Sequence, residues 1–330
     1  WDNILEYELG VIAQSLEQFW SEVNSYQKLN SQISQERKDL FEKINTFYES
    51  IKKYNIKPTE EGDSSDYCTI MNEFQLDECK FDKYYYQTEN ESSHARPMDI
   101  CCNKIQRELA TYINSLPMNY ESSVYVRYDP NNIRNIKALI VGPKDTPYEN
   151  GCYIFDIFIP NNYPNAPPKV NLQTTGGGSV RFNPNLYNSG KVCLSLLGTW
   201  SGDGGEKWNG KTSTLLQVLI SIQSLILVDN PYFNEPGYEK DMNTERGDIE
   251  NKNYNNKVRY FNIMYAINEN IEKPPKEFED VIKYHFKSKK NDINRIIEIW
   301  NNETNIDKDT FDKVKNKCNL LLHDNYFDSI

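Results

Sequence analysis

Strand-like segments dominate residues 122–174, and their succession constrains the fold more than any other feature of the chain. Each segment is rich in β-branched and aromatic residues, and turn-forming residues separate one segment from the next. The four segments are SSVYVRYD (122–129), NIKALIVGP (135–143), GCYIFDIFIP (151–160) and KVNLQT (169–174). This pattern predicts a four-stranded meander.

A helical pattern precedes these segments. Ile100, Ile105, Leu109 and Ile113 form one apolar stripe along residues 97–115. Pro97 suits the start of such a helix, because its fixed φ angle is compatible with the first helical position.

Further helical patterns follow the strand-like segments. Residues 212–230 are apolar almost all round, which predicts a buried central helix with Thr212 or Ser213 as its N-cap. Three amphipathic helices are expected after it, at residues 252–271, 275–301 and 307–322. One helix, a meander and further helices together indicate an α+β fold.

The first part of the chain has a different organisation. Between Leu5 and Ile51, apolar residues recur at alternating spacings of four and three, with Asn30 and Arg37 as polar exceptions. Residues 1–57 are therefore predicted to form a long amphipathic helix or coiled coil, which either self-associates or docks on its own globular domain. Residues 58–95 are acidic and Ser-rich, and they are predicted to be a linker.

Charge and cysteine usage exclude several classes of protein. The net charge of −11 argues against binding to nucleic acid or to an anionic membrane, and it is compatible with a basic partner. The sequence contains no apolar run long enough for a membrane span. Seven irregularly spaced cysteines favour a reducing compartment, so we expect a cytoplasmic protein, with the nucleus as the alternative. Because the chain begins at Trp1, it is expected to be a piece of a longer protein.

One cysteine lies in an unusual context. A free cysteine is most often a small buried residue, which is the default interpretation of Cys193. However, Cys193 follows the tripeptide Asn183-Pro184-Asn185, eight residues beyond Asn185, within RFNPNLYNSGKVCLSLLGTW. Together with GPKDTPYENGCYIFDIFIPNNYPNAPPKV and QVLISIQSLIL, this stretch resembles ubiquitin-conjugating (E2) enzymes. In that family the tripeptide is usually His-Pro-Asn, so Asn183 departs from the pattern.

The resemblance implies a ubiquitin-conjugating-enzyme fold over residues 96–302, with a helical extension at 303–330. Within the family, SLILVDNPYFNEPGYE and FEDVIKYHFKSKK are most similar to the large hybrid E2/E3 enzymes, one of which is a giant inhibitor-of-apoptosis protein. The fold implied is an N-terminal helix, an antiparallel meander, a central buried helix and C-terminal helices.

The resemblance also implies the chemistry. Cys193 would accept ubiquitin from the E1 activating enzyme as a thioester and transfer it to a substrate lysine, which is covalent nucleophilic catalysis. Asn185 would stabilise the developing oxyanion or hold the loop in shape. These roles require a thiol open to solvent with the amide close by. In this family, acidic or polar residues on the loop after the central helix orient the attacking lysine. The candidates here are Asp229, Asn234 and Glu235, with Asp203 and Glu206 in the inserted segment as alternatives.

The implied partners are ubiquitin, E1, protein substrates and, as a further candidate, an E3 ligase. No cofactor or metal is expected, because ATP is used by E1. Asn165 stands where many E2 enzymes place an aromatic residue, which weakens the case for RING or HECT docking. Trp200 and Trp208 are predicted to be packing anchors around an inserted segment. The alternative function is a catalytically inactive E2-like module that binds ubiquitin or an E3.

Overall fold

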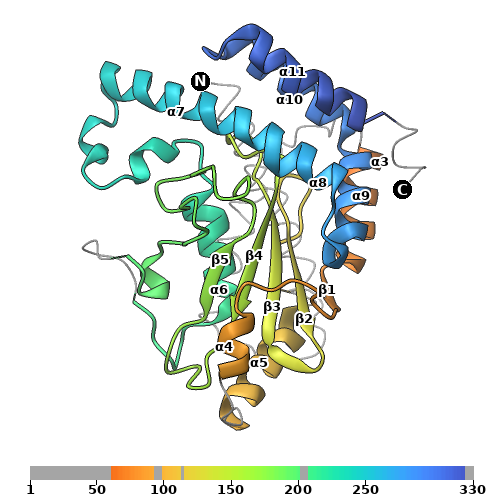
Figure 1. Cartoon of the computed structure of the whole chain (residues 1–330), viewed down its shortest axis with the longest axis vertical. Helices are drawn as coiled ribbons and strands as arrows, with labels where there is room; N and C mark the ends of the chain where they lie inside the picture. The colour runs from red at the N-terminus through yellow and green to blue at the C-terminus, as the bar shows by residue number, and fades with distance from the viewer. Residues whose placement is uncertain (1–60, 93–98, 113–114, 201–206, 324–330) are drawn as a thin grey trace, which may run out of the picture. The chain divides into compact units, whose positions relative to one another are not determined.

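The computed structural model describes residues 61–92, 99–112, 115–200 and 207–323, and Ser64–Ile330 forms one compact unit (Figure 1). The helix or coiled coil predicted at 1–57 lies outside the described residues.

A five-stranded sheet forms the centre of the unit, with the strands in sequence order. The strands are β1 (Leu76–Glu78), β2 (Val124–Asp129), β3 (Asn132–Val141), β4 (Cys152–Phe158) and β5 (Lys169–Leu172). Strands β2 to β5 pair antiparallel, which confirms the predicted meander. Strand β1 pairs parallel to β2, with Leu76 opposite Val126, and it was not predicted.

The prediction of a linker at residues 58–95 was wrong. This region contains α3 (Glu61–Glu73), β1 and α4 (Gln87–Ser92). Tyr67 and Met71 of α3 are buried. The acidic composition concealed these few apolar side chains, which face the interior although most of their neighbours are polar.

One face of the sheet packs against α5 (Asp99–Tyr112) and α6 (Leu215–Ser221). A π-helical segment, η3 (Ile222–Ile226), continues α6. Because successive side chains of a strand point to opposite faces, Val126, Ala138 and Phe155 lie in this first core.

The central helix differs from its prediction in two details. Its N-cap is Thr214 rather than Thr212 or Ser213, and Thr214 and Gln217 form a capping box. It is also not buried all round, because Ile220 and Leu225 are 38% and 60% exposed. An apolar composition therefore did not mean burial on every side of this helix.

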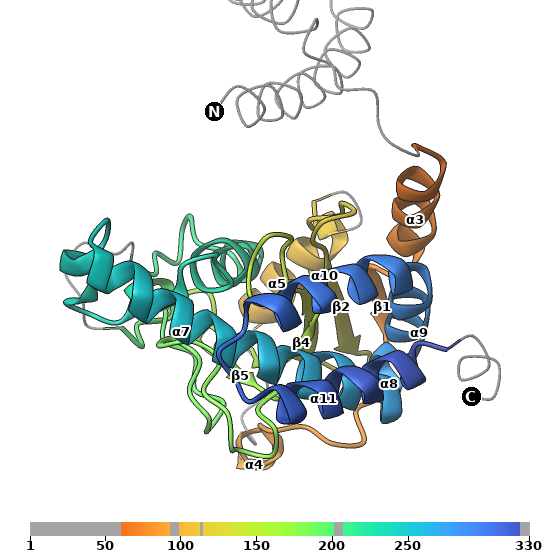
Figure 2. The same ribbon diagram turned by 90° about the horizontal axis from the view of Figure 1, so that it is seen from above.

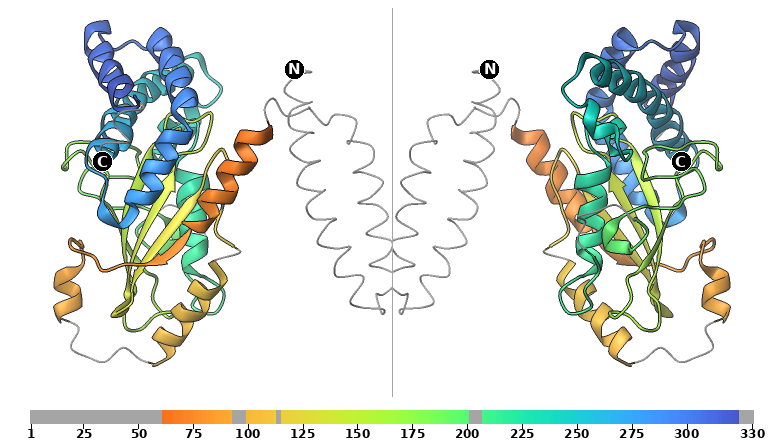
Figure 3. Two further views of the ribbon diagram at one scale, coloured as in Figure 1. Left: turned by 90° about the vertical axis from the view of Figure 1, so that its right-hand side faces the viewer. Right: turned by 90° about the vertical axis from the view of Figure 1, so that its left-hand side faces the viewer.

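The opposite face of the sheet is covered by C-terminal helices (Figures 2 and 3). The predicted helix at 275–301 is two helices that meet at Lys289. The helices are α7 (Glu245–Phe261), continued by the π-helical η6 (Asn262–Asn268) and α8 (Glu269–Glu272), then α9 (Glu279–Ser288), α10 (Lys290–Glu303) and α11 (Lys308–Leu321). Short 3-10 turns complete the chain: η2 (Ser195–Leu197), η4 (Pro231–Asn234), η5 (Tyr238–Asp241) and η7 (Lys276–Phe278).

These helices build a second core. It joins Leu139 and Ile154 of the sheet to Tyr67 of α3, Phe286 of α9 and Trp300 of α10. Helix α11 contributes buried side chains to the same core, so residues 308–321 are part of this core and not a separate extension.

Candidate active site

The tripeptide Asn183-Pro184-Asn185 is anchored to the first core through the side chain of Asn183, which is fully buried. Its amide nitrogen donates to the Tyr148 hydroxyl oxygen at 3.0 Å and to the Ile226 carbonyl oxygen at 2.8 Å. Its oxygen accepts the backbone N–H of Asn185 at 2.8 Å. An asparagine can therefore hold this loop to the end of the central helix, at the position where the family that the sequence resembles usually has histidine.

Asn185 and Cys193 are joined by two reciprocal hydrogen bonds. The backbone N–H of Cys193 donates to the Asn185 carbonyl oxygen, and the Asn185 side-chain amide donates to the Cys193 carbonyl oxygen, each at 2.9 Å. Because a side-chain amide nitrogen carries two hydrogens, the second remains available for another acceptor. The structure thus brings the two predicted catalytic residues together.

The expectation of a thiol open to solvent is not met, because Cys193 is only 4% exposed. Its neighbours Val192 and Leu194 belong to the first core, whereas Cys193 belongs to neither core. The Thr199 hydroxyl donates to the Val192 carbonyl oxygen at 2.8 Å and accepts the Leu194 N–H at 3.0 Å. The Thr199 hydroxyl thus ties together the backbone on both sides of Cys193.

Three other buried cysteines are poor candidates for a nucleophile. Burial raises the pKa of Cys101 to about 11 and that of Cys318 to about 12, and it also raises the pKa of Cys152. Because the thiolate is the nucleophile, these thiols remain unreactive at neutral pH.

The three candidate residues after the central helix are placed differently. The Asn234 side-chain amide donates to the Leu225 carbonyl oxygen at 3.1 Å and to the Asn183 side-chain oxygen at 3.4 Å. Asp229 instead accepts a hydrogen bond from its neighbour Asn230, and its side chain is exposed. Asn234 therefore supports the tripeptide, and no contact links Asp229 to it.

Glu235 reaches the tripeptide through a residue that sequence reasoning missed. Arg181 pairs with the Glu235 carboxylate at 3.1 Å and donates to the Pro184 carbonyl oxygen at 2.6 Å. The available signal was a cation two residues before Asn183 in the sequence. The remaining alternatives, Asp203 and Glu206, lie outside the described residues.

Trp208 is a packing anchor, as predicted. Its indole N–H donates to the Pro164 carbonyl oxygen at 2.6 Å, and its ring lies 5.7 Å from that of Tyr163. The Tyr163 hydroxyl donates to Glu108 at 2.6 Å, and the same carboxylate accepts the backbone N–H of Leu215 at 2.9 Å. This chain of contacts ties the Pro-rich corner to the start of the central helix.

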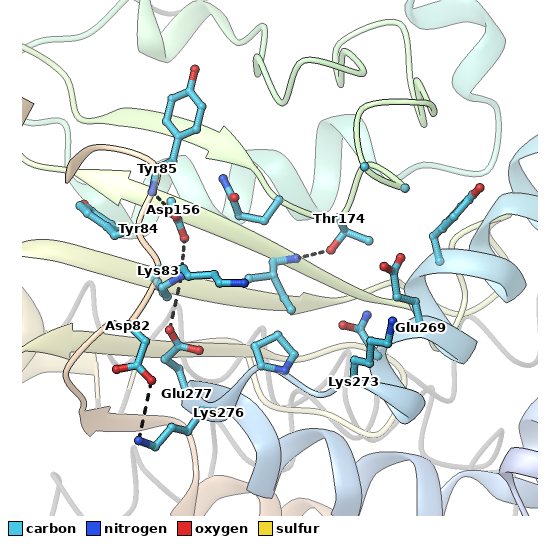
Figure 4. A pocket seen from close by; sticks show the side chains of 18 of the residues that line it. Asp82, Lys83, Tyr84, Tyr85, Asp156, Thr174, Glu269, Lys273, Lys276 and Glu277 are labelled. Atoms are coloured by element: carbon cyan, nitrogen blue, oxygen red, sulfur yellow. Dashed lines mark hydrogen bonds and ion pairs between the residues drawn. The ribbon is translucent and has the colours of Figure 1, made fainter. Parts of the chain in front are cut away.

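None of the residues of the tripeptide, nor Cys193, lines the larger of the two cavities described here. This cavity has a volume of about 640 Å³, and Figure 4 shows Lys83, Asp156, Glu269 and Glu277 around it. None of the candidate catalytic residues lines it, so we do not assign the chemistry to this cavity. A smaller cavity of about 390 Å³ has Pro184 in its wall.

The described residues offer neither a metal-ion site nor a membrane-spanning helix. Within residues 61–92, 99–112, 115–200 and 207–323, no group of three His, Cys, Asp or Glu side chains could hold a metal ion. Over the same ranges, no helix combines the length and apolarity required to cross a membrane.

Comparison with known proteins identifies a shared domain. The family model "Ubiquitin-conjugating enzyme" matches residues 104–262. The human "Dual E2 ubiquitin-conjugating enzyme/E3 ubiquitin-protein ligase BIRC6" is 47% identical over 217 residues, which cover 66% of this chain and 4% of that protein. The Caenorhabditis elegans "Probable ubiquitin-conjugating enzyme protein 17" is 51% identical over 197 residues, or 60% of this chain and 27% of that protein.

One relative aligns over most of the chain. The Acanthamoeba polyphaga mimivirus "Probable ubiquitin-conjugating enzyme E2 R521" is 38% identical over 320 residues, covering 90% of this chain and 22% of that protein. The chain thus spans less than a third of the length of each of these three relatives.

Proposed function

Because residues 104–262 belong to the ubiquitin-conjugating enzyme family, we propose that Cys193 accepts ubiquitin from E1 and passes it to a substrate lysine. The observation that carries this proposal is the pair of reciprocal hydrogen bonds between Asn185 and Cys193, at the family's spacing. These bonds hold the Asn185 amide next to the residue whose sulfur would carry the acyl group.

The proposed reaction has two acyl transfers. The Cys193 thiolate attacks the carbonyl carbon of the E1 thioester, a new carbon–sulfur bond forms, and the E1 thiolate leaves. A deprotonated lysine amine then attacks the ubiquitin thioester on Cys193, an amide bond forms, and the Cys193 thiolate leaves. Each step develops negative charge on the carbonyl oxygen, which a donor such as the second N–H of Asn185 stabilises.

Asn185 is proposed to act in both of the ways that its sequence context implies. Its contact with the Cys193 carbonyl oxygen supports an ordering role, and its second hydrogen supports oxyanion stabilisation. Loss of one such donor typically lowers the rate about 10²- to 10³-fold. We therefore expect Asn185→Ala to lower the single-turnover transfer rate by that factor, measured with free lysine as the acceptor, and to leave charging by E1 far less affected.

We propose Glu235, with Asn234, as the residues that shape the lysine approach, in preference to Asp229. Glu235 is linked to the tripeptide through Arg181, and Asn234 binds Asn183 directly. Asp229→Asn is therefore expected to transfer ubiquitin at the wild-type rate, whereas Glu235→Gln is expected to be slower.

The alternative is an inactive E2-like binding module, which the low exposure of Cys193 favours. Incubation with E1, ATP and ubiquitin separates the two functions. An active enzyme forms an adduct that dithiothreitol removes, and Cys193→Ser converts it to a stable ester. Cys102→Ser is the matched control, because Cys102 is only half-buried and lies on α5. If no adduct forms with ubiquitin or with any ubiquitin-like modifier, the binding module is the better account.

The wider context of this activity is also proposed. Its partners are E1, protein substrates and an E3 ligase, its compartment is the cytoplasm or the nucleus, and it uses no cofactor beyond the ATP consumed by E1. Residues 1–57 are proposed to mediate self-association. Deleting them, while keeping α3 and β1, should lower the mass measured by light scattering if they form a coiled coil.

A further inference from the structure

The cavity of about 390 Å³ beside the tripeptide has walls of mixed character. Pro184 and Arg181 lie on the side of the catalytic loop, and Glu250 and Tyr254 come from α7. The volume falls in the range of pockets that bind small groups. The space therefore lies between the proposed catalytic loop and a helix that follows it in sequence.

Aromatic side chains form one wall of this cavity. The rings of Tyr232 and Tyr238 are 4.6 Å apart, and those of Tyr232 and Tyr254 are 6.4 Å apart. Tyr238 remains 41% exposed. Exposed tyrosine faces attract cationic groups, and they also bury the aliphatic stem of a long side chain.

The cavity lining carries two acidic and two basic side chains, and the segment that supplies much of this lining is acidic. Residues 229–250 contain seven acidic and two basic residues. The charge of Arg181 is offset by Glu235, and Lys257 adds one cation to the wall. Glu250 has no ion-pair partner among the described residues, so its carboxylate is available at the cavity.

We propose that this cavity binds a basic side chain of the substrate, close in sequence to the lysine that receives ubiquitin. The inference rests on the proposed function, because it assigns a substrate class to the same reaction. An arginine or lysine would lay its stem on the tyrosine wall and pair its charge with Glu250. The acceptor lysine itself would lie at Cys193, so the cavity selects segments that contain a second cation.

Arginine-scanned peptides test this proposal. Each peptide carries one acceptor lysine and one arginine at a position between four residues before it and four residues after it, with citrulline in place of arginine as the neutral match. The wild-type protein, charged with ubiquitin, should modify one or two of the arginine peptides about five- to tenfold faster than their citrulline counterparts. Equal rates across the whole scan would overturn the proposal.

Variants identify the groups responsible. Glu250→Lys and Tyr238→Ala should abolish the arginine preference while leaving transfer to free lysine unchanged. Glu73→Lys is the matched control, because it makes the same charge change at an exposed residue. Glu73 belongs to α3, a helix of the second core that contributes no residue to the cavity. If Glu250→Lys slows transfer to free lysine and to peptides alike, the cavity is not a specificity site.

A second readout separates this inference from the proposed function. Fluorescence anisotropy measures binding of the preferred arginine peptide to the uncharged, full chain. Weaker binding of the citrulline peptide, and of the arginine peptide to Glu250→Lys, supports the cavity even if E1 fails to charge Cys193. Failure of charging would count against the proposed function alone, and equal binding of both peptides would count against this inference.

Discussion

The two faces of the sheet are filled in different ways. The face against α5 and α6 is lined by apolar strand residues such as Val126, Ala138 and Phe155. The opposite face is apolar at Leu139 and Ile154 but carries buried charges on other residues of the same strands, namely Arg127, Lys137 and Asp156. Burial of a charge is costly unless it is paired, so the second face needs partners that the first face does not.

Two of those partners, Glu277 and Asp280, come from outside the region that matches the family model, whereas Asp156 lies within it. Arg127 pairs with Asp280 at 3.2 Å and donates to the Glu277 carbonyl oxygen at 2.9 Å. Lys137 pairs with Asp156 at 2.9 Å and with Glu277 at 3.5 Å. The matched residues, 104–262, contain the tripeptide, Cys193 and most of the first core, whereas the second core depends on α3 and α8 to α11. The comparison teaches that the family domain and the folding unit have different boundaries in this chain.

Removing the C-terminal helices should have the largest effect. A chain that ends at Lys273 loses the buried side chains of α9 to α11 and uncovers both Leu139 and the charges at Arg127 and Lys137. We expect it to be unfolded by circular dichroism and to form no ubiquitin adduct. A folded, chargeable fragment would show that the first core suffices alone.

Breaking the buried charge cluster should have the next largest effect. Lys137→Met leaves Asp156 and Glu277 without their cation, and loss of one partner of a buried pair typically costs about 3–5 kcal/mol. Urea unfolding should show this loss in the free energy of unfolding. The double variant Lys137→Met/Asp156→Leu should recover part of it, and no recovery would indicate that the charges do not act as a pair.

Acid should weaken the second core through His285. The Tyr67 hydroxyl donates to Nδ1 at 2.8 Å, and Nε2 lies 3.1 Å from the Asn150 carbonyl oxygen, an arrangement that suits the neutral ring. Burial lowers the pKa of His285 to about 3 from its ordinary 6.5. As the pH falls, His285 therefore takes up a proton in the unfolded state at a higher pH than in the folded state. The free energy of unfolding is at its full value above pH 6.5 and decreases as the pH drops toward 3.

The loss from His285 alone should reach about 2 kcal/mol at pH 5. Urea unfolding of the wild-type protein and of His285→Gln between pH 7.5 and 5 measures it. The variant should be less stable at pH 7.5 but should lose less stability on acidification. Parallel pH profiles would show that other groups cause the acid sensitivity.

The same comparison explains what the sequence could predict. Runs of β-branched and aromatic residues between turn residues predicted β2 to β5, and the family resemblance of the segment around Asn185 and Cys193 implied their proximity, because both are local patterns. Strand β1 has three residues and needs a partner in β2, far along the chain, so no local pattern marks it. The link from Arg181 to the Pro184 carbonyl oxygen and the burial of Cys193 likewise depend on how the loop packs, which periodicity does not report.

The smallest expected effect is at the N-cap of the central helix, on the first face. The Thr214 hydroxyl accepts the backbone N–H of Gln217 at 3.3 Å, and the Gln217 side chain accepts the backbone N–H of Thr214 at 3.2 Å. Replacing such a cap by alanine typically costs about 1 kcal/mol. Thr214→Ala should lower the free energy of unfolding by that amount, measured with urea.

Charging of Thr214→Ala provides the sharper test, because the far end of this helical segment holds Asn183 of the tripeptide. The Ile226 carbonyl oxygen accepts from Asn183 at 2.8 Å, and Ile226 is fully buried in the first core. Packing, and not the cap, therefore fixes the end that the loop uses, so the rate of adduct formation should be unchanged at neutral pH. If the folded variant forms the adduct more slowly, loosening of the helix at Thr214 is transmitted to Asn183. The packing on the first face of the sheet would then be less rigid than its apolar composition implies.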